Sequence, residues 1–238
     1  MARKAARSKA RRSTDRPAPP PDGSTRGRIV EAFMALLAEQ PIERIGLAAI
    51  AERAGVTLAD MRGEFSSPLA VLAAHIKDID RQVLAEIDSE MDEESPRERL
   101  FDVLMRRLEL LTPHKEAMRS LMRSVRRDPP LALALNVMAA RSQQWMLTAA
   151  GIDASGPKGM VRAQGLALLF ANVLRTWVND DDDQTHTLAA LDNQLARGQR
   201  FAGLLDELCR IPEAACAFRE RLRGVRRRGR ESDHRAAM

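Results

Sequence analysis

The sequence lacks several residue types on which whole classes of protein depend. Its 238 residues include no tyrosine and only two cysteines, Cys209 and Cys216. Two cysteines are too few for the disulfide framework of a small secreted domain, and no apolar leader resembles a signal peptide, so we expect a cytoplasmic protein. The longest stretches without a charged residue run about a dozen residues, whereas a membrane-spanning helix needs roughly 20 apolar residues. A transmembrane helix is therefore excluded.

Residues that enzymes and metal sites require are also sparse. The histidines His75, His114, His186 and His234 are scattered, and none has a partner at the i, i+4 spacing of a helical metal site. There is no glycine-rich phosphate loop and no nucleophile elbow. The acidic run at residues 180–183 is explained by the preference for acids at the start of a helix. We expect no metal, no cofactor and no enzymatic activity.

The charge of the chain is segregated along its length. The net charge is +5, but residues 1–28 carry +7 and residues 219–238 carry +5, which leaves −7 on residues 29–218. Basic arms on an acidic body favour a polyanionic partner, either nucleic acid or an anionic membrane surface, or they serve solubility alone. Residues 1–23 contain almost nothing to bury and several prolines, which predicts a disordered arm. A mitochondrial transit peptide is a further possibility, although the arm lacks the apolar face of one.

The remaining apolar residues predict an all-α fold. From residue 24 onward they recur at steps of three and four, and no stretch alternates with the period of a strand. The spacing predicts short helices from Leu47 to Ala54 and from about Leu58 to Phe65, and a long one after Pro68. Breaks rich in proline, glycine and aspartate divide the rest into about five further helices. Gly55 is suited to a left-handed helix end and Thr57 to the N-cap of the next helix.

Residues 26–72 resemble the N-terminal domain of the TetR/AcrR transcriptional regulators. The strongest part of the match is the segment Ile-Ala-Glu-Arg-Ala-Gly-Val-Thr at residues 50–57. The resemblance implies a three-helix, helix-turn-helix head followed by a larger helical domain that binds a ligand and forms a homodimer, through helices near residues 161–177 and 187–208. A helix-turn-helix presents its second helix to the major groove of DNA.

The resemblance also implies which residues contact DNA, and the sequence departs from the family pattern at several of them. Ile45 and Gly46 stand where Thr or Ser is usual, Arg62 replaces Tyr, Glu64 replaces a basic or His residue, and Pro68 replaces Lys. Arginine still suits guanine edges or phosphate. The predicted DNA contacts are Arg26, Arg28, Gly46, Thr57, Leu58, Asp60 and Arg62.

A second resemblance covers residues 106–198. This stretch is similar to the C-terminal part of the lipid-binding accessory protein of ubiquinone biosynthesis, which has a TetR-like fold, a degenerate helix-turn-helix and a pocket for isoprenoid lipid. That family's amphipathic membrane helix corresponds here to residues 201–222, interrupted by Pro212. Either resemblance predicts a pocket for a small apolar ligand or lipid, and mixed Met and Leu suit an adaptable cavity. The candidate pocket residues are Phe101, Leu104, Leu108, Met118, Met122, Trp145, Phe170 and Val173.

These observations favour one function and leave one alternative open. The first is a TetR-type regulator whose binding to a double-stranded DNA operator is controlled by a small apolar effector. The alternative is a lipid-binding accessory protein of quinone or isoprenoid metabolism that does not bind DNA and touches the membrane peripherally. We expect a basic arm at residues 1–23, a helix-turn-helix head at 24–68, a ligand-binding and dimerisation domain at 69–210 and a basic tail at 211–238. The head is a DNA-binding domain in the first case and a degenerate one in the alternative.

Overall fold

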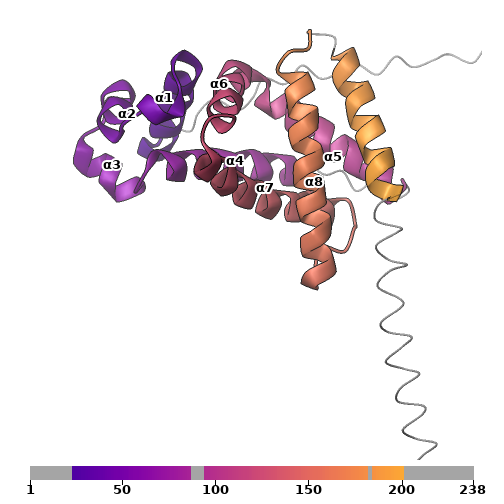
Figure 1. Ribbon diagram of the computed structural model, residues 1–238. Coiled ribbons are helices and arrows are strands. Elements are labelled where there is room, and N and C mark those ends of the chain that lie inside the picture. Colours follow the sequence, from indigo (N-terminus) through magenta and orange to yellow (C-terminus); the bar gives the residue numbers. More distant parts are fainter. Residues whose placement is uncertain (1–22, 87–93, 182–183, 201–238) are drawn as a thin grey trace, which may run out of the picture.

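The computed structural model describes residues 23–86, 94–181 and 184–200. Within these ranges every regular element is helical, which confirms the predicted all-α fold (Figure 1). No helix in these ranges is long and apolar enough to cross a membrane. The predicted basic arm up to residue 22, the proposed amphipathic segment at 201–222, the basic tail and both cysteines lie outside the described residues.

A small head is formed by α1 (Thr25–Glu39), a 3-10 turn η1 (Ile42–Arg44), α2 (Leu47–Ala54) and α3 (Leu58–Glu64). The bounds of α2 and α3 agree, to within one residue, with the helices that the apolar spacing predicts. Its core contains Ile29, Phe33, Leu37, Ile50 and Met61, each almost fully buried. The three helices therefore close around one apolar centre, as a helix-turn-helix requires.

The turn between α2 and α3 depends on one glycine. Gly55 has φ 64° and ψ 39°, the left-handed conformation that costs side-chain-bearing residues free energy. Its N–H and that of Val56 return to the last turn of α2, the latter donating to the Ala51 carbonyl at 3.0 Å. The predicted role of Gly55 as a left-handed helix end is confirmed.

Longer helices build the body. They are α4 (Pro68–Ala85), α5 (Pro96–Leu111), the 3-10 turn η3 (Thr112–His114), α6 (Lys115–Val125), α7 (Pro129–Ala149), α8 (Gly156–Trp177) and a last described helix at residues 185–200. The head lies at one end of the molecule, and α8 and the last helix lie side by side at the other (Figure 1).

Local sequence explains where three of these helices start. Ser67, Ser95 and Asp128 each accept a hydrogen bond from a backbone N–H in the first turn, and each precedes a proline at the first helical position. Proline is tolerated there because its missing N–H would have no partner in the helix. A capping side chain followed by proline therefore fixes the start of α4, α5 and α7.

The buried apolar residues form two clusters. One joins the head to the first half of α4, to α6 and to Leu131 at the start of α7. The other fills the body between the end of α4, α5, the end of α7, α8 and the last helix, with Leu104, Leu108, Val173 and Trp177 at its centre. Since α4 contributes to both clusters, it couples the head mechanically to the body.

Candidate nucleic-acid interface and ligand cleft

Helix α3 begins with a reciprocal capping box. The Asp60 N–H donates to Thr57 Oγ1 at 3.1 Å, while the Thr57 N–H and hydroxyl donate to Asp60 Oδ2 at 3.1 and 2.7 Å. These hydrogen bonds, with nearby Arg28, lower the pKa of Asp60 below its ordinary value. Thr57 and Asp60 were predicted as DNA contacts; their polar groups instead bond to each other, so the donor of the Thr57 hydroxyl is already used.

Two predicted contact residues share the exposed face of α3. Leu58 is 60% exposed, and Arg62 lies one turn further along the same face. Within the described part of the chain Arg62 has no ion pair, whereas Met61 and Phe65 are buried and hold the helix on the head. The exposed surface of α3 thus presents one apolar side chain and one free guanidinium, together with the carboxylates of Asp60 and Glu64.

Arg26 braces α1 against α3. Its guanidinium lies 3.8 Å from Glu64 Oε2 and 4.8 Å from the centroid of the Phe65 ring. The pair offsets the negative charge that Glu64 adds near the recognition surface. Arg28, two residues further on α1, is exposed beside Asp60. The predicted contact Arg26 therefore has a structural partner, and Arg28 is the freer cation.

The N-terminus of α2 offers backbone donors. Gly46 is its N-cap, is exposed and has no side chain to accept a hydrogen bond; the first intrahelical bond runs from the Ile50 N–H to the Gly46 carbonyl. Helix N-termini of this kind bind anions such as phosphate, because the first N–H groups lack partners in the helix. The side chain of Ile45, just before this N-terminus, is only 4% exposed and contributes packing but no polar contact.

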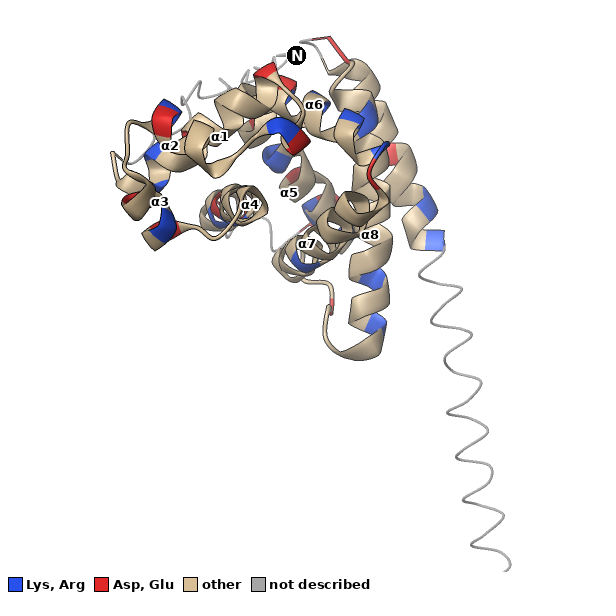
Figure 2. Ribbon diagram, turned by 60° about the vertical axis from the view of Figure 1, so that its left-hand side comes forward, with Lys and Arg blue, Asp and Glu red and all other residues tan. Residues whose placement is uncertain are grey.

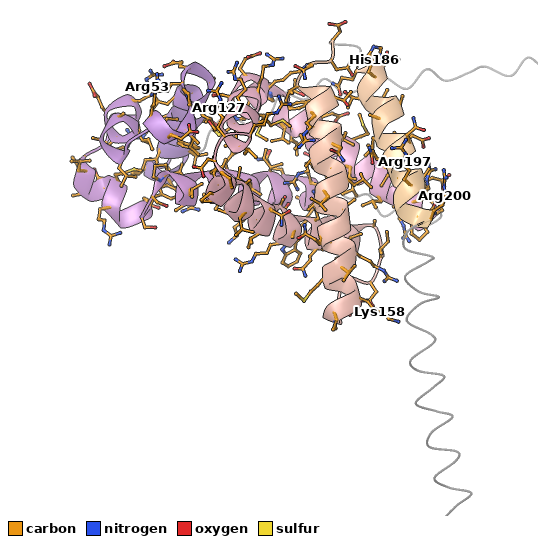
Figure 3. All side chains as sticks on the ribbon, in the orientation of Figure 1. Arg53, Arg127, Lys158, His186, Arg197 and Arg200 are labelled. Atoms are coloured by element: carbon orange, nitrogen blue, oxygen red, sulfur yellow. The ribbon has the colours of Figure 1, made fainter. Side chains whose placement is uncertain are left out.

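The charge of the head is close to balanced. Residues 23–67 contain five arginines and six acidic residues, and cations and anions are intermixed over it (Figure 2). Arg53 forms a bidentate pair with Glu39, with N···O distances of 2.9 and 2.8 Å, and is labelled on the head in Figure 3. Within the head, the cations without an ion pair are Arg28, Arg44 and Arg62.

Most of the predicted ligand-pocket residues lie in the packed core of the body or against it. Leu104, Leu108, Phe170 and Val173 are buried in the body core, and Phe101, Met118 and Met122 pack against it. Trp145 differs most from the prediction, because it is 59% exposed on the outer face of α7. By helical spacing Trp145 shares a stripe of α7 with Leu131 and Met138. Trp145 remains exposed because α8 packs against a different face of α7.

The body instead has a cleft of about 630 Å³ between α5, the end of α7, α8 and the last helix. None of the eight predicted pocket residues lines it. Its polar lining includes Arg97, Arg162, Asn172, Gln194 and Arg197. Its apolar lining includes Leu100, Leu147, Ile152, Val161, Leu166, Leu169 and Leu195. A cavity of this size is in the range of small-molecule sites, about 300–1,000 Å³.

A buried polar cluster connects α4, α5 and α7. Asp80 accepts hydrogen bonds from Arg107 and, at 2.8 Å, from the Ser142 hydroxyl, and the Arg107 guanidinium lies 5.6 Å from the centre of the Phe170 ring. Burial lowers the pKa of Arg107, and Asp80 acts in the opposite direction. Sequence reasoning missed this cluster, although Asp80 follows Ile76 by four residues on the inward stripe of α4.

Metal-ligand geometry is absent from the residues that the structure describes: no group of three or more His, Cys, Asp or Glu side chains there is arranged to hold an ion. Asp180, the first residue of the acidic run at 180–183, has a structural role instead. Asp180 Oδ2 accepts hydrogen bonds from the Thr187 N–H and hydroxyl at 2.7 and 2.6 Å, which lowers the pKa of Asp180. Asp180 thereby ties the loop after α8 to the last helix.

The fold is similar to that of solved TetR transcriptional regulators. A TetR regulator from Nitrosomonas europaea aligns with a TM-score of 0.59 and 21% identity, over 74% of this chain and 98% of that one. Another, from Rhodococcus sp. RHA1, aligns with a TM-score of 0.52 and 22% identity, over 73% and 95% of the two chains. No family model and no curated protein sequence matches the chain. The described part of the chain thus has a TetR-like fold.

Proposed function

We propose that the protein is a TetR-type transcriptional regulator, a DNA-binding protein and not an enzyme, which acts in the cytoplasm. The observation that carries the proposal is the geometry of the head: a helix-turn-helix in which Gly55 sets the turn and α3 exposes Leu58 and Arg62. The likeness of the whole fold to the two TetR regulators supports it.

In this proposal α3 enters the major groove. Arg62 binds a guanine edge or a phosphate, and Leu58 contacts a thymine methyl group. The free N–H groups at the start of α2, beside Gly46, bind a backbone phosphate. Arg28, exposed on α1 near Asp60, adds positive charge to the head. Thr57 and Asp60 act indirectly, by holding the first turn of α3 in place. The arm at residues 1–28, with a charge of +7, adds attraction that does not depend on sequence.

The body, residues 69–210 in the predicted division, is proposed to form a homodimer and to bind the effector. Exposed apolar side chains gather on α7 and α8: Leu133 and Val137 on one, Met160 and Leu168 on the other. Asn136 and Gln164 join the two helices through reciprocal hydrogen bonds of 3.2 and 2.8 Å. Exposed apolar patches mark protein interfaces, and a symmetric dimer would address two half-sites one helical turn apart.

The effect of a ligand bound in the body can be transmitted to the head through α6. The Ser120 hydroxyl donates to the Gln40 carbonyl at 3.2 Å, and the Ser124 hydroxyl donates to Glu43 Oε2 at 2.9 Å. Both bonds join α6 to the segment that follows α1. A ligand that moves α5 or α8 against α6 would therefore change the relative orientation of the two heads of the dimer. The affinity for DNA would change with it.

The proposal is tested by binding of the purified protein to DNA flanking its own gene, at about 150 mM salt with excess competitor, where sequence-independent binding fades. We expect saturable nanomolar binding to one palindrome and a loss of at least about tenfold for Arg62→Ala. Arg53→Ala is the matched control, because it also removes one exposed head arginine but on α2, paired with Glu39. Equal binding by Arg62→Ala and the unmodified protein contradicts the proposal, as does weak, salt-sensitive binding that deletion of residues 1–28 removes.

A second candidate is the lipid-binding accessory protein without DNA binding. The nearly balanced charge of the head favours it, since most DNA-binding surfaces are strongly basic. The same DNA titration decides between the two: indifference to sequence supports the second candidate, and a search for isoprenoid lipids that copurify with the protein then follows.

A further inference from the structure

The cleft of the body is lined mainly by apolar side chains and carries several positive charges. Three arginines line it, Arg97, Arg162 and Arg197, and none of the described residues that line it is acidic. This composition contrasts with the region around it, because residues 29–218 carry a net charge of −7. A cleft whose described lining carries arginines and no carboxylate favours an anionic group on an otherwise apolar molecule.

The three arginines are not equivalent. Arg97 donates to Asp192 Oδ1 at 2.5 Å and so connects α5 to the last helix. Arg162 donates to the Asp153 carbonyl at 3.1 Å. Arg197 has neither an ion pair nor a hydrogen bond within the part of the chain that the structure describes, and Figure 3 labels it on the last helix. Arg197 is therefore the cation available to a ligand.

Two glycines shape the cleft. A side chain at Gly198 would begin 3.2 Å from Leu169 Cδ1, so glycine there lets the last helix approach α8 closely. At Gly165, on α8, an added Cβ would meet no atom within 4 Å. The space beside Gly165 is part of the cleft, and its neighbours Leu166 and Leu169 are apolar.

We propose that this cleft binds a single-chain amphiphile with an anionic head group, such as a fatty carboxylate. The alkyl chain lies along the leucines of α5 and α8, and the head group pairs with Arg197 at the rim. Charge complementarity argues against a second copy of the chain as the occupant, because a symmetric partner would bring the same arginines. That the amphiphile is the effector rests on the function proposed above; its binding to the cleft does not.

The experiment is calorimetric titration of the full-length protein without DNA, using laurate below its micellar concentration. Dodecanol supplies the same chain without a charge, and dodecyl phosphate supplies another anionic head. We expect one laurate per chain, with Arg197→Glu raising the Kd at least about tenfold for laurate and leaving that of dodecanol nearly unchanged. Lys158→Glu, at an exposed position of α8 outside the cleft, is the matched charge control and leaves both unchanged. The tighter of laurate and dodecyl phosphate identifies the preferred head group.

A second pair of variants tests the position of the chain. Gly165→Phe fills the cleft and abolishes binding of laurate and dodecanol, whereas Gly165→Ala leaves it open and binds both; thermal melts establish that both variants fold. Laurate that binds Gly165→Phe as well as the unmodified protein overturns the proposal. So does a dimer in the unmodified protein that Gly165→Phe dissociates, since a second copy would then occupy the cleft. A protein that binds laurate here but no specific DNA retains this site and loses only its proposed role as a regulator.

Discussion

The imidazole rings of His75 and His114 meet edge to face, with their centroids 4.7 Å apart and their planes at 89°. His75 lies on α4 and is almost fully buried, while His114 ends the turn η3. On its other side, His114 Nε2 lies 3.9 Å from Glu31 Oε1 on α1. The pair therefore sits where the body meets the head.

The first prediction concerns the pH dependence of stability. Burial, then the neighbouring charges of His114 and Arg107, lower the pKa of His75 from 6.5 to about 3. The unfolded chain takes up this proton near pH 6.5, but the folded protein takes it up only near pH 3. As the pH falls through that window, the free energy of unfolding decreases by about 1.4 kcal/mol per pH unit from this residue alone.

Urea denaturation at pH 7 and pH 5 measures the effect. His75→Leu, which cannot titrate, should reduce the loss of stability between the two pH values by about 2 kcal/mol. His186→Ala, at an exposed histidine, should leave the loss unchanged. An identical loss in His75→Leu and the unmodified protein would show that His75 is protonated in the fold.

The second prediction concerns the buried pair of Asp80 and Arg107. Asp80→Asn removes the charge that offsets the buried guanidinium, and we expect a decrease of about 3–5 kcal/mol in the free energy of unfolding. In Arg53→Ala the exposed pair with Glu39 is broken instead, and the expected decrease is much smaller, because water screens that pair.

The double variant Asp80→Leu with Arg107→Met should recover most of the stability, because neither buried charge remains. Chemical denaturation of the single and double variants measures each value. A double variant less stable than Asp80→Asn would mean that packing, not charge pairing, gives the cluster its importance.

The third prediction concerns the dimer. Leu133→Glu combined with Leu168→Glu places charge in the exposed apolar patch of α7 and α8, where both side chains are more than half exposed. We expect the proposed dimer to dissociate, since burying an unpaired charge at an interface is unfavourable. Sedimentation velocity reports the change, and Lys77→Glu on α4 is the control. A dimer that survives the double substitution must use another surface.

Much of the architecture was accessible from the sequence, because it depends on local signals. The apolar stripes fixed the helices of the body, and Ser67, Ser95 and Asp128 fixed where three of them start. Gly55 and Thr57 gave the turn of the helix-turn-helix and the cap of its second helix. These features involve residues within a few positions of one another, so their physics is contained in short segments.

The chemical roles of individual side chains were less accessible. Thr57 and Asp60 were candidates for DNA contact, but each satisfies the other at the start of α3. Arg26 was a candidate as well, and it pairs with Glu64 almost forty residues away. Residue type and helix position do not reveal which polar partner is nearest in space, so the free donors could only be identified in the folded head.

The sequence by itself determined the helical class, the positions of the helices and the turn of the head, since the periodicity of apolar residues and the capping side chains act locally. Only the tertiary structure decided where the cleft of the body lies. Each apolar stripe predicts that its residues are buried. A cleft, however, forms where the surfaces of two packed helices do not match in shape, and the stripes do not show where that happens. Gly165 and Gly198 lie about thirty residues apart in the sequence, and both line the same cleft only because α8 and the last helix pack side by side.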